Sequence, residues 1–261
     1  MESHGFCPQC GEMVPAGASF CGRCGAKIAP RRSSGDGLSA IVHLPSNLTD
    51  SDIVYLHGYC FVDKGDWKRG STVLESTGAR VQKGALVNAM LMAALASLTR
   101  EGWVEVEIVN IGFLLPCNTP IVRGVTWAPF PKGGLEGALV STLQRQDKLN
   151  SLDQIMLRLV GWDRDDPWEE LIGRVREHLV EAGYFRKLEN PEARGLGGLL
   201  HPRFRYEANA ALVASSAGEI SRVRANMADV LGRSPHVWEK VAKQIDRALK
   251  ACKARSDSSD D

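Results

Sequence analysis

Four cysteines close to the N-terminus form the pattern with the clearest chemistry in this sequence. They lie as two Cys-x-x-Cys pairs in the stretch CPQCGEMVPAGASFCGRCG, at Cys7, Cys10, Cys21 and Cys24. Tetrahedral Zn²⁺ accepts four thiolates, and two such pairs supply them from two tight turns. A glycine follows each pair, which permits a turn that points backbone N–H groups at the sulfur atoms. The spacing predicts one bound zinc ion.

The competing interpretation of these cysteines is a pair of disulfides. The first residues, MESHGF, show no charged segment followed by an apolar one, so we recognise no export signal. We therefore expect a cytoplasmic protein, at most peripheral on a membrane, whose thiols stay reduced. A reducing compartment favours zinc over disulfides.

A zinc site with four cysteine ligands has no open position for water or substrate, so the predicted site is structural. The segment between the pairs is short and holds no basic cluster or aromatic pair that would grip nucleic acid. Binding of a structural zinc ion contributes about 10–16 kcal/mol in small peptides, enough to fold such a module by itself. We interpret it as a clamp or a docking module.

The rest of the chain has the composition of an ordinary globular protein. Its 261 residues carry a net charge of +1 and are 44% hydrophobic, which leaves room for one substantial further domain. The longest apolar run is shorter than the roughly 20 residues that span a bilayer, so we expect no transmembrane segment. We divide the chain into a zinc ribbon (5–28), a flexible linker (29–37), a main domain (38–252) and a disordered polar tail (253–261).

Three helices are predicted in the main domain. The first covers residues 84–101 and ends at Gly102. The second begins at Pro167, where Asp166 caps it and Glu169 completes a capping box. The third covers residues 236–255 and has one apolar stripe and many lysines. Such a helix docks its stripe onto the domain or, alternatively, lies on an anionic membrane.

The first two helices end in similar sequences, LTREGWV and LVEAGYF, each followed by an extended stretch. A helix, a glycine and a returning hairpin are the parts of a winged-helix-like unit. The fold class is therefore predicted to be mainly α with short β-hairpins, a small zinc ribbon joined to a helical, winged-helix-like domain. Coincidence is the alternative explanation, because helix–glycine–strand endings are common.

No established catalytic motif occurs in the sequence, which favours a non-catalytic protein. The six histidines are scattered, and His178 lies beside the apolar face of its helix. Asp166 and its neighbours in WDRDDPW are explained by a helix cap and a loop.

Basic residues are the remaining candidates for ligand binding. The segment 186–205 contains five of them, Arg186, Lys187, Arg194, Arg203 and Arg205, against two glutamates. Arg222, Arg224 and Arg233 follow. Such clusters attract phosphate groups of lipids or nucleic acids. A merely solvated basic surface is the alternative.

The order of residues between about 48 and 233 resembles the Golgi phosphoprotein 3 family, phosphoinositide-binding proteins with bacterial relatives. Four stretches carry the resemblance: LTDSDIVYLHGYCFVDKGDW, KGALVNAMLMAALASLTREGWV, LIGRVREHLVEAGYF, and HPRFRYE followed by ISRVRANMADVL. Members of this family bind a phosphorylated inositol head group with a tryptophan and several arginines. They are not known as enzymes, so the resemblance implies a non-catalytic binding protein.

The resemblance implies a partial head-group site in this chain. Trp67 would match the tryptophan of the family, and Lys83 would match one arginine. A basic pair of the family falls at Glu169 and Ile172, so that part is missing. Together with the basic segment, the candidate anion-binding or lipid-binding residues are Trp67, Lys83, Arg186, Lys187, Arg203 and Arg205.

Three functions remain open on the sequence. The leading hypothesis is a non-catalytic protein with one structural zinc ion, whose helical domain binds an anionic membrane lipid or a protein partner. The second is a nucleic-acid-associated protein that uses the ribbon and the winged-helix-like units, although the modest charge counts against it. The third is an enzyme.

Overall fold

The computed structural model describes residues 5–6, 13–14, 21, 23–24, 48–63, 70–111, 117–126, 128–144, 150–161, 165–190 and 204–256. Several predicted features lie outside these residues: Cys7, Cys10, the linker 29–37, Trp67, Arg194, Arg203 and the tail beyond residue 256.

The long helix α2 (Lys83–Arg100) lies at the centre of the helical domain. Its residues from Met90 to Leu98 are all buried, because the sequence is apolar around almost the whole helix. Five helices pack against it: α1 (Asp50–Leu56), α3 (Gly134–Gln144), α5 (Pro167–Glu181), α7 (Glu219–Arg233) and α8 (Pro235–Ser256). The predicted helix at 84–101 is confirmed.

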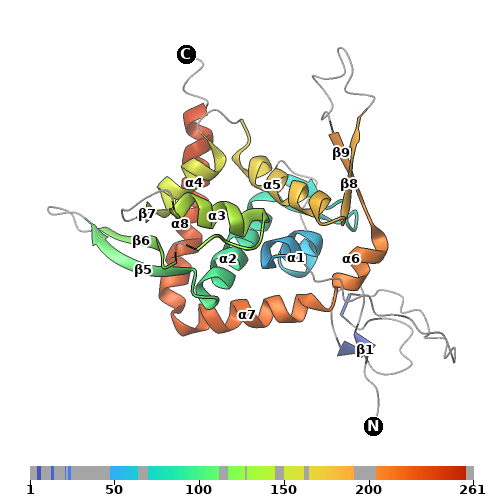
Figure 1. Cartoon of the computed structure of the whole chain (residues 1–261), viewed down its shortest axis with the longest axis horizontal. Helices are drawn as coiled ribbons and strands as arrows, with labels where there is room; N and C mark the ends of the chain where they lie inside the picture. The colour runs from blue at the N-terminus through green and yellow to red at the C-terminus, as the bar shows by residue number, and fades with distance from the viewer. Residues whose placement is uncertain are drawn as a thin grey trace, which may run out of the picture.

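The other elements are short. Helix α4 (Leu152–Val160) packs against α8, and α6 (Ala210–Ser216) joins a hairpin to α7 (Figure 1). A 3₁₀ turn, η1 (Gly58–Cys60), follows α1. The strands pair only with antiparallel neighbours: β1 (Gly5–Phe6) with β2 (Met13–Val14), β3 (Ser71–Val73) with β4 (Arg80–Gln82), β5 (Val104–Ile111) with β6 (Cys117–Gly124), β6 with β7 (Asn150–Ser151), and β8 (Phe185–Glu189) with β9 (Phe204–Ala208). This is the predicted class, mainly α with short hairpins.

The predicted helix–glycine–hairpin unit occurs twice with the same backbone geometry. Gly102 ends α2 at φ +75°, and Gly183 ends α5 at φ +80°. In each unit the aromatic residue after the glycine donates its N–H back to a leucine carbonyl at 2.8 Å, from Trp103 to Leu98 and from Tyr184 to Leu179. Each helix then continues into a hairpin, β5–β6 or β8–β9. The shared sequence pattern therefore reports a shared structure.

The start of α5 follows the prediction in part. Asp166 caps the helix by accepting the N–H of Glu169 at 3.1 Å. The carboxylate of Glu169 instead contacts Arg176 and Lys83. Leu171, Val175 and Leu179 of this helix are fully buried, and they recur at the spacing of one helix face.

Helix α8 docks its apolar stripe onto the domain, as predicted. Val241, Ile245, Leu249 and Cys252 are buried, and Trp238 is buried beside them. The helix continues to Ser256, so it includes the first residues of the segment that was predicted as a tail.

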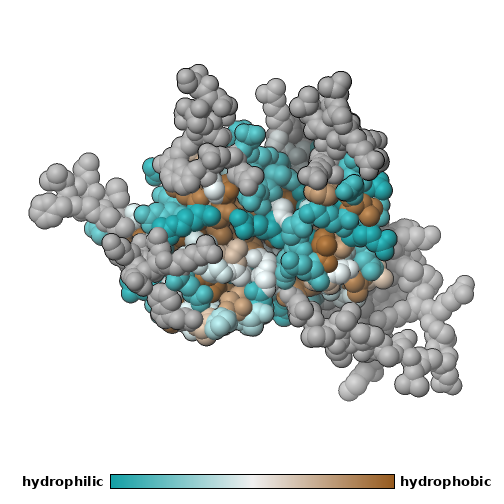
Figure 2. Space-filling model, turned by 45° about the horizontal axis from the view of Figure 1, so that its top comes forward, coloured by the Kyte–Doolittle hydropathy of each residue, from teal (hydrophilic) through white to brown (hydrophobic). Residues whose placement is uncertain are grey.

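The face in Figure 2 is mostly hydrophilic, with small hydrophobic areas between polar ones. Among the described large hydrophobic residues, only Val73 and Val125 are exposed. Within the same part of the chain, no helix combines the length and the apolar character needed to span a bilayer.

Candidate functional site

The N-terminal module contains a short β-ribbon. β1 and β2 pair in antiparallel register, with Gly5 opposite Val14 and Phe6 opposite Met13. In the sequence, the first Cys-x-x-Cys pair comes between these two strands, outside the described residues.

Two of the predicted zinc ligands are described. Cys21 is 2% exposed, whereas Cys24 is exposed and forms a turn with Arg23. A buried cysteine followed by a turn back to a second cysteine fits a four-thiolate zinc site. These residues would hold the ion, and the ion would fix the two turns against each other.

The turn at Arg23 and Cys24 affects the ionisation of Cys60, at the end of η1. Burial raises the pKa of the Cys60 thiol, and a hydrogen bond from Tyr59 opposes the shift. The charges of Arg224 and Arg23 lower this pKa as well, and Cys24 raises it. Arg23 and Cys24 therefore lie near enough to Cys60 to affect its ionisation.

Lys83, the residue matched to a family arginine, is bound by carboxylates of its own chain. Its Nζ lies 2.6 Å from Oδ2 of Asp166 and 3.6 Å from Oε2 of Glu169. The side chain is 19% exposed. A phosphate approaching Lys83 would have to displace these carboxylates.

The basic residues of the β8–β9 hairpin are also near carboxylates. Lys187 lies 2.6 Å from Glu177 and its ammonium stands 4.4 Å from the centre of the Phe204 ring. Arg205 lies 3.3 Å from Glu207. Arg186 is exposed and stands opposite Glu207 in the hairpin register.

The candidate residues do not converge on one site. Lys83 binds residues at the start of α5, whereas the partner of Lys187 is Glu177, further along that helix. At 1.5 Å per residue, Glu169 and Glu177 are separated by about 12 Å along the helix axis. The described part of the predicted head-group site is therefore two separate groups of ion pairs.

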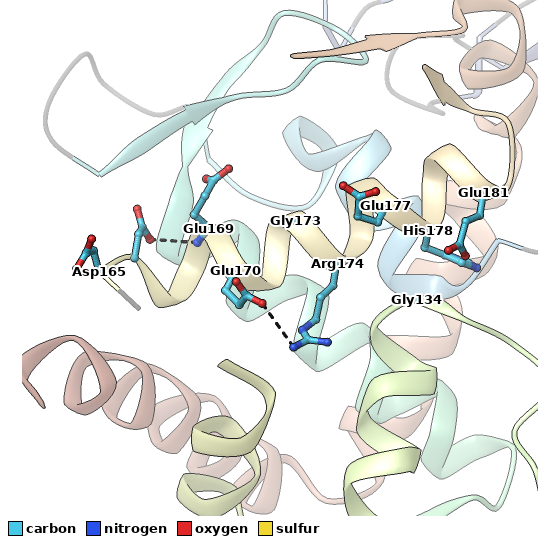
Figure 3. Close-up of a pocket in the computed structure, with 10 residues that line it drawn as sticks. Gly134, Asp165, Glu169, Glu170, Gly173, Arg174, Glu177, His178 and Glu181 are labelled. Carbon is cyan, nitrogen blue, oxygen red and sulfur yellow. Dashed lines mark hydrogen bonds and ion pairs between the residues drawn. The ribbon is translucent and has the colours of Figure 1, made fainter. Parts of the chain in front are cut away.

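A groove runs along α5, and its lining has the opposite charge (Figure 3). Its volume is about 690 Å³. Six carboxylates line it with one arginine, one histidine and two glycines: Asp165, Asp166, Glu169, Glu170, Glu177, Glu181, Arg174, His178, Gly173 and Gly134. Such a lining repels phosphate groups.

His178 connects this groove to a buried polar cluster at the start of α1. Its Nδ1 lies 2.9 Å from Oδ2 of Asp52, which also accepts the N–H and the hydroxyl of Thr49 at 2.8 Å each. Thr49 and Asp52 form the reciprocal capping box of α1. The hydrogen bond to Asp52 raises the pKa of His178, and burial opposes this shift.

Two further carboxylates belong to this cluster. Glu136 of α3 accepts the N–H of Ser51 at 2.9 Å and its hydroxyl at 2.6 Å. Asp50 lies 2.8 Å from Arg222 of α7 and accepts a hydrogen bond from Asn226 at 3.3 Å. Burial, followed by the charge of Asp52, raises the pKa of Glu136 to about 7.

The sequence analysis missed both the groove and the cluster. The signal for the cluster was the stretch LTDSD, since Thr at a cap and Asp three residues later predict a capping box. Its burial and its partners on α3, α5 and α7 come from tertiary packing, which no local pattern reports.

The comparisons with known proteins bear on the N-terminal module. Residues 6–28 match the zinc-ribbon domain. No curated protein and no solved structure matches the chain. The chain therefore carries a zinc-ribbon domain at residues 6–28, followed by a helical domain with short antiparallel hairpins.

Proposed function

We propose that this chain is a non-catalytic adaptor whose zinc ribbon docks onto a protein partner and whose helical domain carries the ribbon. The zinc-ribbon match supports the module, and four thiolates would leave its zinc ion without an open position for chemistry. One zinc ion per chain follows from this set of ligands.

The observation that carries this proposal is the ion pairing of the basic residues in the helical domain. Lys83, Lys187 and Arg205 each lie within 3.3 Å of a carboxylate of the same chain. Exposed ion pairs add little stability, but they neutralise the charge that a phosphate would need. The ribbon is therefore the better candidate for the contact surface.

The test is affinity capture of binding proteins at about 0.15 M salt. At this salt concentration, interactions between exposed charges are screened beyond about 8 Å, which suppresses unspecific electrostatic binding. The full chain is compared with Cys21→Ser, and proteins retained by the first but not the second are identified and purified. We expect a purified partner that binds the full chain and loses binding when zinc is removed. A partner that binds both forms equally would overturn the docking role of the ribbon.

A second candidate function, binding to anionic lipid, rests on the resemblance to the Golgi phosphoprotein 3 family and on one observation. Arg186 and Arg205 are both exposed on the β8–β9 hairpin, at diagonal positions of its two strands, since Arg186 pairs with Glu207 and Arg205 lies two residues before it. Each basic residue near an anionic surface contributes about 1 kcal/mol, so two of them give only weak association. Salt-sensitive sedimentation with anionic liposomes, lost in Arg186→Glu/Arg205→Glu, would favour this function.

A further inference from the structure

The polar cluster at the start of α1 joins four helices inside the protein. Asp50, Ser51 and Asp52 belong to α1, Glu136 to α3, His178 to α5 and Arg222 to α7. The residues Asp50, Ser51, Asp52 and Glu136 are all at most 3% exposed. Charges at such positions need partners, because burial removes them from water.

The carboxylates in this cluster outnumber the cationic partners. Asp50 has Arg222 and Asp52 has His178, at 2.8 Å and 2.9 Å. The two hydrogen bonds that Glu136 accepts come from Ser51, a neutral residue. Its charged neighbours on α1 and α5 are Asp52, which is anionic, and His178, which is already engaged by Asp52. The negative charge of Glu181 also raises the pKa of His178.

A second observation points to an excess of negative charge. Oδ1 of Asp52 is buried and has no hydrogen-bond partner among the described residues, while Oδ2 accepts three hydrogen bonds. The site therefore already holds one incompletely satisfied carboxylate. An ionised Glu136 would add a second negative charge beside it.

We propose that this cluster holds a proton on Glu136 in mildly acidic solution, and that loss of this proton as the pH rises through neutrality weakens the packing of α3 against α1. The protonated carboxyl is the form that a buried position without a free cation favours. The pKa of Glu136, raised to about 7 by burial and by Asp52, agrees with this geometry.

The direction of the pH effect follows from linkage. The folded pKa lies above the ordinary value of 4.5, so the folded state binds this proton more tightly than the unfolded chain does. The resulting stabilisation is complete below about pH 4.5 and is lost as the pH rises to about 7. His57, whose pKa burial lowers to about 4, acts in the opposite direction over part of this range. His57 is present in both the wild type and Glu136→Gln, so comparing these two proteins removes its contribution.

The experiment is chemical denaturation of the full chain and of Glu136→Gln between about pH 5 and pH 8.5. Glutamine mimics the neutral carboxyl. We divide the folding equilibrium constant of the variant by that of the wild type at each pH. This ratio is expected to rise on the order of a hundredfold between about pH 5 and about pH 8.5. Exposed Glu105→Gln is the control and is expected to give a constant ratio. A constant ratio for Glu136→Gln as well would overturn the proposal.

A measurement on the wild type keeps the test decisive if Glu136→Gln does not fold. Infrared spectra of the folded protein in D₂O report the C=O stretch of protonated carboxyl groups. We expect such a band near neutral pH and its disappearance as the pH rises past about 7, with slower exchange of the Ser51 amide while the band is present. A folded protein without this band at about pH 6 would refute the proton on Glu136.

Discussion

The Nδ1 atom of His178 lies 2.9 Å from Oδ2 of Asp52, and neither side chain is more than 8% exposed. This contact joins α5 to the capping box at the start of α1. His178 also lines the α5 groove (Figure 3), so the contact joins the groove to the buried polar cluster. A change in either residue therefore affects the core and the groove together.

Replacing Asp52 by Asn is expected to destabilise the fold by about 1–3 kcal/mol in mildly acidic solution, because His178 loses its anionic partner. His178 has a raised pKa, so its contribution is complete below about pH 6.5 and is lost as the pH rises through the folded value. The loss should therefore shrink toward about pH 8.5. Denaturation curves at several pH values measure it.

Asp166→Asn is the control for that prediction, because it makes the same chemical change at the cap of α5, where asparagine caps equally well. It also removes the ion pair with Lys83, which at this exposure contributes about 0–1 kcal/mol. A small change is expected there. A loss in Asp52→Asn that grows with pH would contradict the role of His178.

Two glycines beside the groove should respond to alanine in opposite directions. A Cβ on Gly133 would lie 2.7 Å from Cδ2 of His178, so Gly133→Ala is expected to cost about 1–3 kcal/mol. A Cβ on Gly173, inside α5, meets nothing within 4 Å. Gly173→Ala should therefore stabilise the protein by about 0.5–1 kcal/mol. Thermal denaturation of both variants measures the two effects. Destabilisation by Gly173→Ala would contradict the open space beside Gly173.

Arg176 is expected to be more important for stability than Arg174, its neighbour on the same helix. Arg176 is 11% exposed, lies 2.7 Å from Glu75 and donates to the hydroxyl of Tyr55 at 2.8 Å. Removing it leaves a partly buried carboxylate unpaired, which costs about 3 kcal/mol or more. Arg174 is 39% exposed, and Arg174→Ala should cost less than about 1 kcal/mol. Equal effects of the two alanine variants on the unfolding free energy would contradict this ranking.

The local parts of the fold were predictable because short sequence patterns determine them. Gly102 and Gly183 mark helix ends where a positive φ is needed, and Asp166 marks a helix start. The apolar stripe of α8 predicted its buried face. Each of these features depends on residues within a few positions of one another.

The candidate ligand residues were not predictable in the same way. Lys83 and Asp166 are 83 positions apart in the chain, yet their side chains are 2.6 Å apart. A count of basic residues does not show which of them already have acidic partners. The six carboxylates of the groove, by contrast, all lie within residues 165–181, and the helical period of α5 places them along one side of that helix.

The zinc prediction concerns the N-terminal module alone. Freshly reduced full-length protein is expected to contain one zinc ion per chain, and Cys21→Ser is expected to lose it while the helical circular dichroism signal remains. Cys252→Ala, a change in α8, should retain the zinc. Elemental analysis gives the metal content, and zinc-free wild-type protein would refute the four-thiolate site.

The central claim is that internal ion pairs neutralise the basic residues of the helical domain. Sedimentation with anionic liposomes at about 0.15 M salt is its most direct test. We predict that the wild type stays in the supernatant, whereas Glu177→Gln/Glu207→Gln, which frees Lys187 and Arg205, sediments with anionic but not with neutral liposomes. Sedimentation of the wild type with anionic liposomes alone, abolished by Arg186→Glu/Arg205→Glu, would contradict the account.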